Sequence, residues 1–274
     1  MGSLAVLIDQ LEPEVEDPEE ETFILYSQPI PSLDLGFIDP RAASVDVSVA
    51  GHDFTIHQSP AVLSSSRAGG TTGAVLELGC GISPLSALAL APRVSRYILT
   101  DQSYVHRLLQ RNIDENLETA LGSSGTSTPT GRSRKKRGGH AHPLSKPNIH
   151  FTTLDWEKDE VTPSLTGCNE TRSFDAVVAC DCVYNYALVS PFVQTCVDAC
   201  RLRLADDAFT GDDSRPCICV IGQQLRNDEV FESWLETFHA SFRVWRVPDG
   251  ALPEDLRSSA GFVVHIGVLR DEMR

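Results

Sequence analysis

Several features that would assign the chain to a particular class of protein are absent from its 274 residues. Its eight cysteines form no C-x-x-C pair, so a zinc site is weakly supported and we expect buried, reduced thiols and no bound metal. No uncharged apolar run reaches the roughly 18 residues that a membrane-spanning helix needs. Residues 1–40 contain ten acids but no lysine or arginine, so a secretory signal is not expected. These absences together predict a cytoplasmic protein.

Basic residues are scarce in the chain as a whole. There are 23 lysines and arginines against 38 aspartates and glutamates, which gives a net charge of −15. A chain of this charge repels the phosphates of nucleic acids, so we expect no direct nucleic-acid binding outside one basic segment. It is better suited to bind a basic protein.

That basic segment lies within residues 122–147, where glycine, serine, threonine and proline supply sixteen of the 26 positions. Five arginines and lysines lie between positions 132 and 137. We expect a disordered surface loop inserted into the main domain. It is either a tolerated insertion or a patch that contacts RNA or directs nuclear import, in which case the protein is also nuclear.

The N-terminal part of the chain precedes the regular pattern. Residues 1–44 are expected to form a solvated acidic arm; the alternative is that the arm steers a basic partner. Residues 45–73 hold a predicted hairpin, with strands Val45–Val49 and Phe54–His57, and a lead-in to the main domain at 74–274.

Residues 74–274 alternate between short apolar runs and segments with helical spacing of apolar residues. The expected strands are Ala74–Leu78, Tyr97–Thr100, Ile149–Thr153, Phe174–Ala179, Cys217–Gly222, Phe242–Val247 and Phe262–Leu269. The expected helices are Pro84–Ala91 with Ser83 as its cap, Ser103–Leu121, Leu188–Leu204 and Asp228–Ala240. The pattern predicts an α/β fold with a doubly wound, mostly parallel, seven-stranded sheet. Because Pro248–Ala260 leaves no room for a helical crossover, the last strand is expected to be antiparallel.

A glycine turn follows the first of these strands. Gly79 and Gly81 allow a tight turn and a close approach of a ligand to the backbone. A dinucleotide site would need a third glycine where this chain has Pro84, which lacks an N–H to offer a phosphate. The turn therefore favours an uncharged or zwitterionic nucleoside. Asp101 ends the second strand, where its carboxylate would accept the ribose hydroxyls or cap a helix.

Acidic and aromatic residues follow the third and fourth strands as well. Asp155 and Trp156 would flank an adenine by hydrogen bonding and stacking, although Trp156 is alternatively a partly buried core residue. Asp181 and Tyr184 would bind a substrate amine and line its approach. The alternative for this pair is a helix-capping aspartate beside a packed tyrosine.

These motifs resemble the methyltransferase-16 family of seven-β-strand protein-lysine methyltransferases. The matching segments are Glu77–Gly81, Leu99–Asp101, Leu154–Trp156 and the D-x-x-Y motif at Asp181–Tyr184. Further segments resemble the fungal ribosomal members of the family, namely Ile56–Pro60, Gly70–Ala74, Leu99–Val105 and Ala179–Asn185. The resemblance extends over residues 45–270.

The resemblance implies a Rossmann-like class I methyltransferase fold with S-adenosylmethionine as methyl donor. It implies a lysine of a basic protein, a large-subunit ribosomal protein, as acceptor. The implied cofactor-binding residues are Glu77, Gly79, Cys80, Gly81, Asp101, Asp155, Trp156 and Cys180, and the implied catalytic residues are Asp181 and Tyr184. Asp181 would orient the amine while Tyr184 walls the channel.

The chain departs from this family at one point. In the family, the segment that matches Thr72–Val75 leads into a tryptophan and a helix, whereas here it runs directly into Leu76–Gly79. This departure favours one alternative, a non-catalytic, methyltransferase-like binding protein. A second alternative is an NAD-dependent oxidoreductase. The missing third glycine and the acid–aromatic pair at Asp181 and Tyr184 argue against it.

Overall fold

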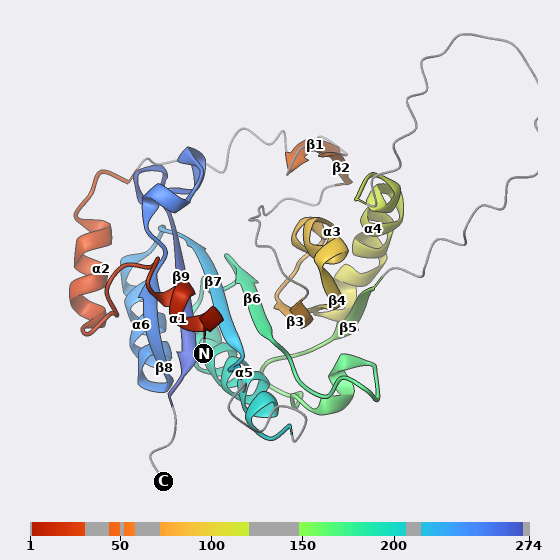
Figure 1. Ribbon diagram of the computed structural model, residues 1–274. Helices are drawn as coiled ribbons and strands as arrows, with labels where there is room; N and C mark the ends of the chain where they lie inside the picture. Colours follow the sequence, from red (N-terminus) through yellow and green to blue (C-terminus); the bar gives the residue numbers. More distant parts are fainter. Residues whose placement is uncertain are drawn as a thin grey trace, which may run out of the picture.

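The computed structural model describes residues 2–30, 44–49, 52–57, 72–120, 148–206 and 215–270. Its main sheet has seven strands in the order β5-β4-β3-β6-β7-β9-β8 (Figure 1). In chain order these are β3 (Thr72–Leu78), β4 (Val94–Asp101), β5 (Ile149–Thr153), β6 (Ala176–Cys180), β7 (Ile218–Gln224), β8 (Phe242–Arg246) and β9 (Phe262–Leu269). The five neighbouring strands β5, β4, β3, β6 and β7 are parallel to one another, and β9 is antiparallel to both β7 and β8. The predicted class I methyltransferase sheet with an antiparallel last strand is confirmed.

The chain reverses its direction across the sheet between β3 and β6. It passes from β3 outward to β4 and β5, then returns to the other side of β3 to form β6. Leu78 is in register with Thr100 of β4 and with Ala179 of β6, so the three strands end close together. A crevice at such a switch point is where open α/β sheets bind ligands.

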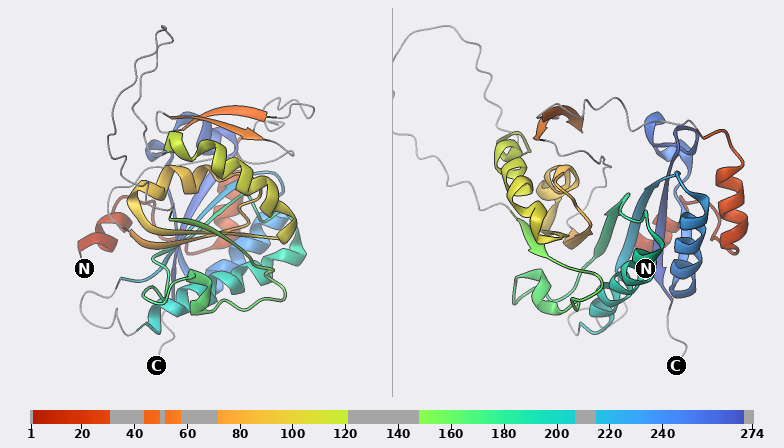
Figure 2. Two further views of the ribbon diagram at one scale, coloured as in Figure 1. Left: turned by 90° about the vertical axis from the view of Figure 1, so that its right-hand side faces the viewer. Right: turned by 180° about the vertical axis from the view of Figure 1, so that it is seen from behind.

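Helices cover both faces of the sheet (Figures 1 and 2). On one face α3 (Leu85–Leu90) and α4 (His106–Ala120) pack over a core that includes Val75, Tyr97 and Leu99. On the other, α5 (Tyr186–Leu204) and α6 (Asp228–Ser241) pack over a larger core with Leu76 and Leu78. Neighbouring residues of β3 thus enter opposite cores, because side chains alternate along a strand. The doubly wound arrangement follows.

The predicted cap of the first helix after the glycine turn is wrong. The helix begins at Leu85, and Pro84 occupies the cap position without a side-chain hydrogen bond. Ser83 still belongs to the turn, since its N–H donates to the Cys80 carbonyl at 3.3 Å. The helices after β6 and β7 do have side-chain caps. Asn185 accepts from the Ala187 N–H at 3.0 Å, and Asn227 accepts from the Val230 N–H at 2.9 Å.

The acidic N-terminal segment is not the solvated arm that its composition predicts. Residues 2–30 contain α1 (Gly2–Ile8) and α2 (Pro18–Tyr26), and the segment between them runs along β8. The Val15 N–H donates to the Val244 carbonyl at 2.8 Å, and Leu25 of α2 is fully buried. In Figure 1, α2 lies beside α6.

Pairing of acids with bases explains this difference. Glu14 binds the guanidinium of Arg243 through both carboxylate oxygens. The Glu21 carboxylate lies 3.1 Å from the His265 ring and 3.5 Å from the Arg246 guanidinium. Acids that look solvated by composition therefore hold the segment on the last two strands.

We expect Leu25→Ala to lower the free energy of unfolding by about 2–4 kcal/mol, because truncating a buried leucine leaves a cavity. Phe23→Ala, on the exposed face of the same helix, should change it by less than about 0.5 kcal/mol. Urea unfolding of the two variants and the parent chain provides the measurement. Equal, small effects would show that α2 does not dock on α6 in solution.

The predicted N-terminal hairpin is confirmed. β1 (Ser44–Val49) and β2 (His52–His57) pair antiparallel, and β2 lies alongside α4 (Figure 2).

The predicted basic loop at 122–147 lies outside the described residues, so its proposed roles stay predictions. Within the described ranges, no helix is both long and apolar enough to cross a membrane.

Candidate active site

The glycine turn after β3 is fixed to the end of β4. Gly79 and Gly81 both have positive φ, 67° and 56°, which a residue with a side chain rarely adopts. The Gly81 N–H donates to the Asp101 carboxylate at 2.8 Å, and the Cys80 N–H donates to the Thr100 carbonyl at 3.1 Å. The sequence-predicted residues Gly79, Cys80, Gly81 and Asp101 are therefore brought together.

The two glycines differ in what surrounds them. A Cβ on Gly79 would lie 2.7 Å from the Cys182 Cβ and 3.2 Å from the Trp156 ring, so this backbone is packed closely against the wall behind it. A Cβ on Gly81 would meet no atom of the described residues within 4 Å. The turn thus has a packed side at Gly79 and an open side at Gly81, where a ligand can approach the backbone.

Asp101 retains capacity to bind a ligand. Its second carboxylate oxygen accepts from the Gln102 N–H at 2.6 Å. Each carboxylate oxygen can accept two hydrogen bonds. These two backbone contacts use one acceptor position on each oxygen, so one acceptor position on each oxygen remains for a ligand. The position of Asp101 at the end of β4 agrees with the predicted contact to ribose hydroxyls, which stays a prediction.

Glu77 is buried beneath the turn. Its carboxyl group accepts a 2.7 Å hydrogen bond from the Tyr97 hydroxyl, and the residue is 4% exposed. Burial raises the pKa of Glu77 to about 7; the Tyr97 hydrogen bond opposes the rise, and the nearby Asp101 charge adds to it. Burial likewise raises the pKa of the Cys80 thiol. The Thr100 hydroxyl donates to the Glu77 carbonyl at 2.7 Å, which ties β3 to β4.

Trp156 lines the same site from the loop after β5. Its ring contacts Phe192 edge-on, with centroids 5.2 Å apart, and a Cβ on Gly79 would touch it. The indole N–H is buried and has no partner among the described residues. The packing matches the alternative of a partly buried aromatic, yet it leaves one unsatisfied donor beside the glycine turn. Stacking on a nucleobase stays a prediction.

The carboxylate of Asp155 is already engaged. It lies 2.6 Å from the Lys158 ammonium and accepts from the Glu157 N–H at 3.1 Å. The hydrogen bond from Lys158 is the largest cause that holds the pKa of this carboxyl below its usual range. Asp155 therefore stays charged next to Trp156, at the end of β5 where it was predicted.

Asp181 follows β6 in a left-handed conformation, with φ of 51°. Its side chain is 13% exposed and forms an ion pair with the Arg226 guanidinium. The Gln224 N–H donates to its other oxygen at 3.3 Å. Burial raises the pKa of Asp181, and the Arg226 charge opposes the rise. Asp181 is thus a partly buried carboxylate with a cation beside it.

The two other predicted site residues near β6 differ in exposure: Tyr184 is exposed and Cys180 is largely buried. Tyr184 is 68% exposed, so its ring extends into solvent at the rim. Cys180 ends β6, and burial raises the pKa of its thiol to about 12. All eight cysteines are free, most of them buried as expected, and the described residues hold no group of three or more potential metal ligands.

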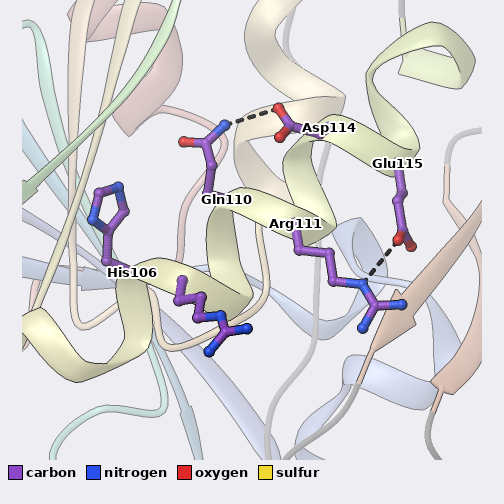
Figure 3. A pocket seen from close by; sticks show the side chains of 6 residues that line it. His106, Gln110, Arg111, Asp114 and Glu115 are labelled. Carbon is purple, nitrogen blue, oxygen red and sulfur yellow. Dashed lines mark hydrogen bonds and ion pairs between the residues drawn. The ribbon is translucent and has the colours of Figure 1, made fainter.

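Arg226 is the residue that the sequence analysis missed. It follows β7, which pairs with β6, so the loops after these strands meet at the same edge of the sheet. The signal available was a basic residue just after the fifth predicted strand. A hollow along α4 is lined by His106, Arg107, Gln110, Arg111, Asp114 and Glu115 (Figure 3).

Comparisons with known proteins now bear on this site. No family model matches the chain. A protein from Zygosaccharomyces rouxii named Ribosomal lysine N-methyltransferase 5 is 30% identical over 186 residues, which are 65% of this chain and 52% of the relative. This chain is a relative of that protein. The protein of the same name from Saccharomyces cerevisiae (strain YJM789) is 29% identical over 203 residues, covering 66% of this chain and 53% of the relative. The predicted resemblance is confirmed, although the chain spans about half the length of these relatives.

Other similarities are more distant. The Diaminohydroxyphosphoribosylamino-pyrimidine deaminase of Schizosaccharomyces pombe is 23% identical over 259 residues, which are 84% of this chain and 53% of that protein. Among solved structures, the YcgJ protein of Bacillus subtilis has a TM-score of 0.44 at 12% identity, covering 74% of this chain and 94% of that one. The S-adenosylmethionine-dependent methyltransferase SibL has a TM-score of 0.40 at 14% identity, and the match covers 72% of this chain and 50% of SibL.

Proposed function

We propose that the chain is an S-adenosylmethionine-dependent methyltransferase that modifies a lysine side chain of a large-subunit ribosomal protein. The observation that carries the proposal is the hydrogen bond from Gly81 to Asp101 at the ends of β3 and β4, inside a class I methyltransferase sheet. The names of the yeast relatives support lysine as the acceptor.

The residues at the strand ends fit the proposed cofactor. Among the described residues, nothing would touch a Cβ on Gly81 and the Trp156 indole N–H beside Gly79 has no partner, and Asp101 keeps acceptor positions for ribose hydroxyls. Pro84 offers no N–H to a phosphate, which suits a zwitterionic nucleoside better than a dinucleotide. When bound, S-adenosylmethionine supplies an electrophilic methyl group on its sulfonium. Glu77, Cys80, Cys180 and Asp155 form the surroundings of this site.

Asp181 is the proposed amine-binding residue. A lysine has an unperturbed pKa of about 10.4 and must lose a proton before it can act as a nucleophile. Partial burial disfavours the charged form of such an amine, whereas the charge of the Asp181 carboxylate favours it, and the carboxylate can accept a hydrogen bond from the amine N–H. Tyr184, exposed at the rim, is placed to contact the substrate segment that enters.

Charge supports a basic protein as substrate. The net charge of −15 attracts a basic ribosomal protein and raises the rate of encounter at low ionic strength. We place the reaction in the cytoplasm, with nuclear import dependent on the basic segment at 132–137.

One observation favours a second candidate, a non-catalytic, methyltransferase-like binding protein. Thr72–Leu78 forms one uninterrupted strand, so the family's intervening tryptophan and helix have no counterpart between Val75 and Leu76. The NAD-dependent oxidoreductase gains no support from the site, because Pro84 still stands where a dinucleotide would need an N–H.

The test is transfer of a tritiated methyl group from S-adenosylmethionine to proteins of purified large ribosomal subunits, followed by hydrolysis and amino-acid analysis. We expect label in methyl-lysine, and about a 100-fold slower transfer by Asp181→Asn, which removes a charged partner of the amine. Asp198→Asn, at a half-exposed carboxylate on α5, should leave the rate unchanged. A folded chain that binds S-adenosylmethionine but labels no lysine would support the binding protein instead.

A further inference from the structure

Arg226 is held on Asp181 from two directions. Its Nη2 pairs with the Asp181 carboxylate, and its Nε donates to the Gln224 side-chain carbonyl at 2.8 Å. The Gln224 N–H in turn donates to Asp181 at 3.3 Å. Arg226 is 41% exposed at its side chain whereas Asp181 is 13% exposed, so the ion pair joins a partly exposed guanidinium to a largely buried carboxylate. The three residues form one network across the ends of β6 and β7.

We propose that Arg226 is a positioning residue that balances the charge of Asp181, so that an amine bound there is held in its neutral form. The inference rests on the proposed function and adds a residue outside the D-x-x-Y motif. The observation that carries it is the ion pair at the candidate amine-binding carboxylate.

The physical argument concerns the protonation state of the acceptor. A lone carboxylate of low exposure stabilises an ammonium ion and raises its pKa, and an ammonium ion has no lone pair for attack. A guanidinium cannot be deprotonated in proteins, so Arg226 keeps its charge throughout the working range of pH. The neutral Asp181–Arg226 pair can accept a hydrogen bond from an amine without stabilising its charged form. The proton released by the amine leaves to solvent.

Among the described residues, Arg226 supplies the charge that acts on Asp181 itself, and other titratable groups act on the two cysteines that flank it. Glu77 on β3 and Asp101 on β4 both act electrostatically on the cysteines next to Asp181. Glu229, at the start of α6, is engaged by the Tyr186 hydroxyl, from which it accepts a hydrogen bond at 3.1 Å. Cys180 and Cys182 flank Asp181, and burial keeps both thiols protonated by raising their pKa. Without Arg226 the Asp181 carboxylate would act on a bound amine as an unbalanced negative charge and would favour the ammonium ion.

The test compares Arg226→Gln, Arg226→Lys and the parent chain, with Arg243→Gln as a matched control at an arginine that pairs with Glu14 on the far edge. The pH dependence of kcat and KM is measured with S-adenosylmethionine and total protein of the large ribosomal subunit. For Arg226→Gln we expect the rising limb of kcat to move about one pH unit upward, with KM unchanged or lower. Arg226→Lys should restore the profile, and Arg243→Gln should leave it unmoved. An unmoved profile in Arg226→Gln would overturn the inference.

A second measurement separates this inference from the proposed function. The Asp181 carboxyl is titrated by NMR in the free parent chain and in Arg226→Gln, where no transfer is needed. We expect its pKa to be higher in Arg226→Gln, because the favourable charge is lost. An identical pKa of Asp181 in the two proteins would overturn the pairing. If the pKa differs as expected but the parent chain transfers no methyl group, the proposed function is overturned and the pairing stands. If Arg226→Gln does not fold, Asp181→Asn is compared with the parent chain in urea unfolding, because this variant removes the charge that Arg226 binds. Equal stabilities of these two proteins would overturn the pairing.

Discussion

Replacing Gly79 by alanine is expected to lower the free energy of unfolding by about 2–5 kcal/mol, from left-handed strain and overpacking together. The new methyl group would lie 2.7 Å from the Cys182 Cβ and 3.2 Å from the Trp156 ring, and neither neighbour is the free end of a flexible chain. The φ of 67° adds strain for any residue with a Cβ. Urea unfolding measures the effect.

Gly81→Ala is the matched variant. Its φ of 56° is similar, but its methyl group would meet no atom within 4 Å in the part of the chain that the structure describes, so conformational strain alone is expected. We expect a loss of about 1–2 kcal/mol in stability. Affinity for S-adenosylmethionine should fall by at least about tenfold, because the methyl group would stand where a ligand approaches the backbone. Equal losses of stability at the two glycines would contradict the packed and open sides described for this turn.

Glu77→Gln is expected to remove a fall in stability between about pH 4.5 and pH 7. The folded chain raises the pKa of Glu77 to about 7 from the ordinary value of 4.5, mainly by burial. Between these values the folded state retains a proton that the unfolded state has released, so stability decreases as the pH rises. The full loss, complete above pH 7, is about 3 kcal/mol for a fully buried group.

Unfolding in urea at pH 5, 6, 7 and 8 tests this expectation. The stability advantage of Glu77→Gln over the parent chain should grow across the series and level off above pH 7. Glu236→Gln, at an exposed position on α6, should give a curve parallel to that of the parent chain. A Glu77→Gln curve parallel to the parent would show that Glu77 is ionised in the folded state.

Much of the fold could be predicted because local patterns determine it. The apolar run of β3 and the two glycines after it require a strand and a turn. The last strand could be placed because Pro248–Ala260 is too short for an α-helical crossover, and the segment holds only short 3-10 helices in the structure. These inferences use residues close together in the sequence.

The errors and omissions concern contacts between distant residues. The N-terminal segment looked solvated because its acids are visible in the sequence, whereas their partners Arg243, Arg246 and His265 lie more than 200 positions away. The pairing of Arg226 with Asp181 was missed for the same reason, since two loops 45 positions apart meet only in the folded sheet. The Ser83 cap failed because the serine N–H stays in the glycine turn.

The most direct test of the account is calorimetric titration of the folded chain with S-adenosylmethionine, with Asp101→Asn as the paired variant. The amide oxygen of the variant can still accept from the Gly81 N–H, while its NH2 group replaces the oxygen that accepts from the Gln102 N–H, so the Gly81 contact of the turn is kept and the charge at the ribose contact is lost. The account predicts saturable binding by the parent chain and an affinity at least about tenfold lower for the variant. A folded parent chain that does not bind, or equal affinity in both proteins, would contradict the assignment of the strand-end site to this cofactor.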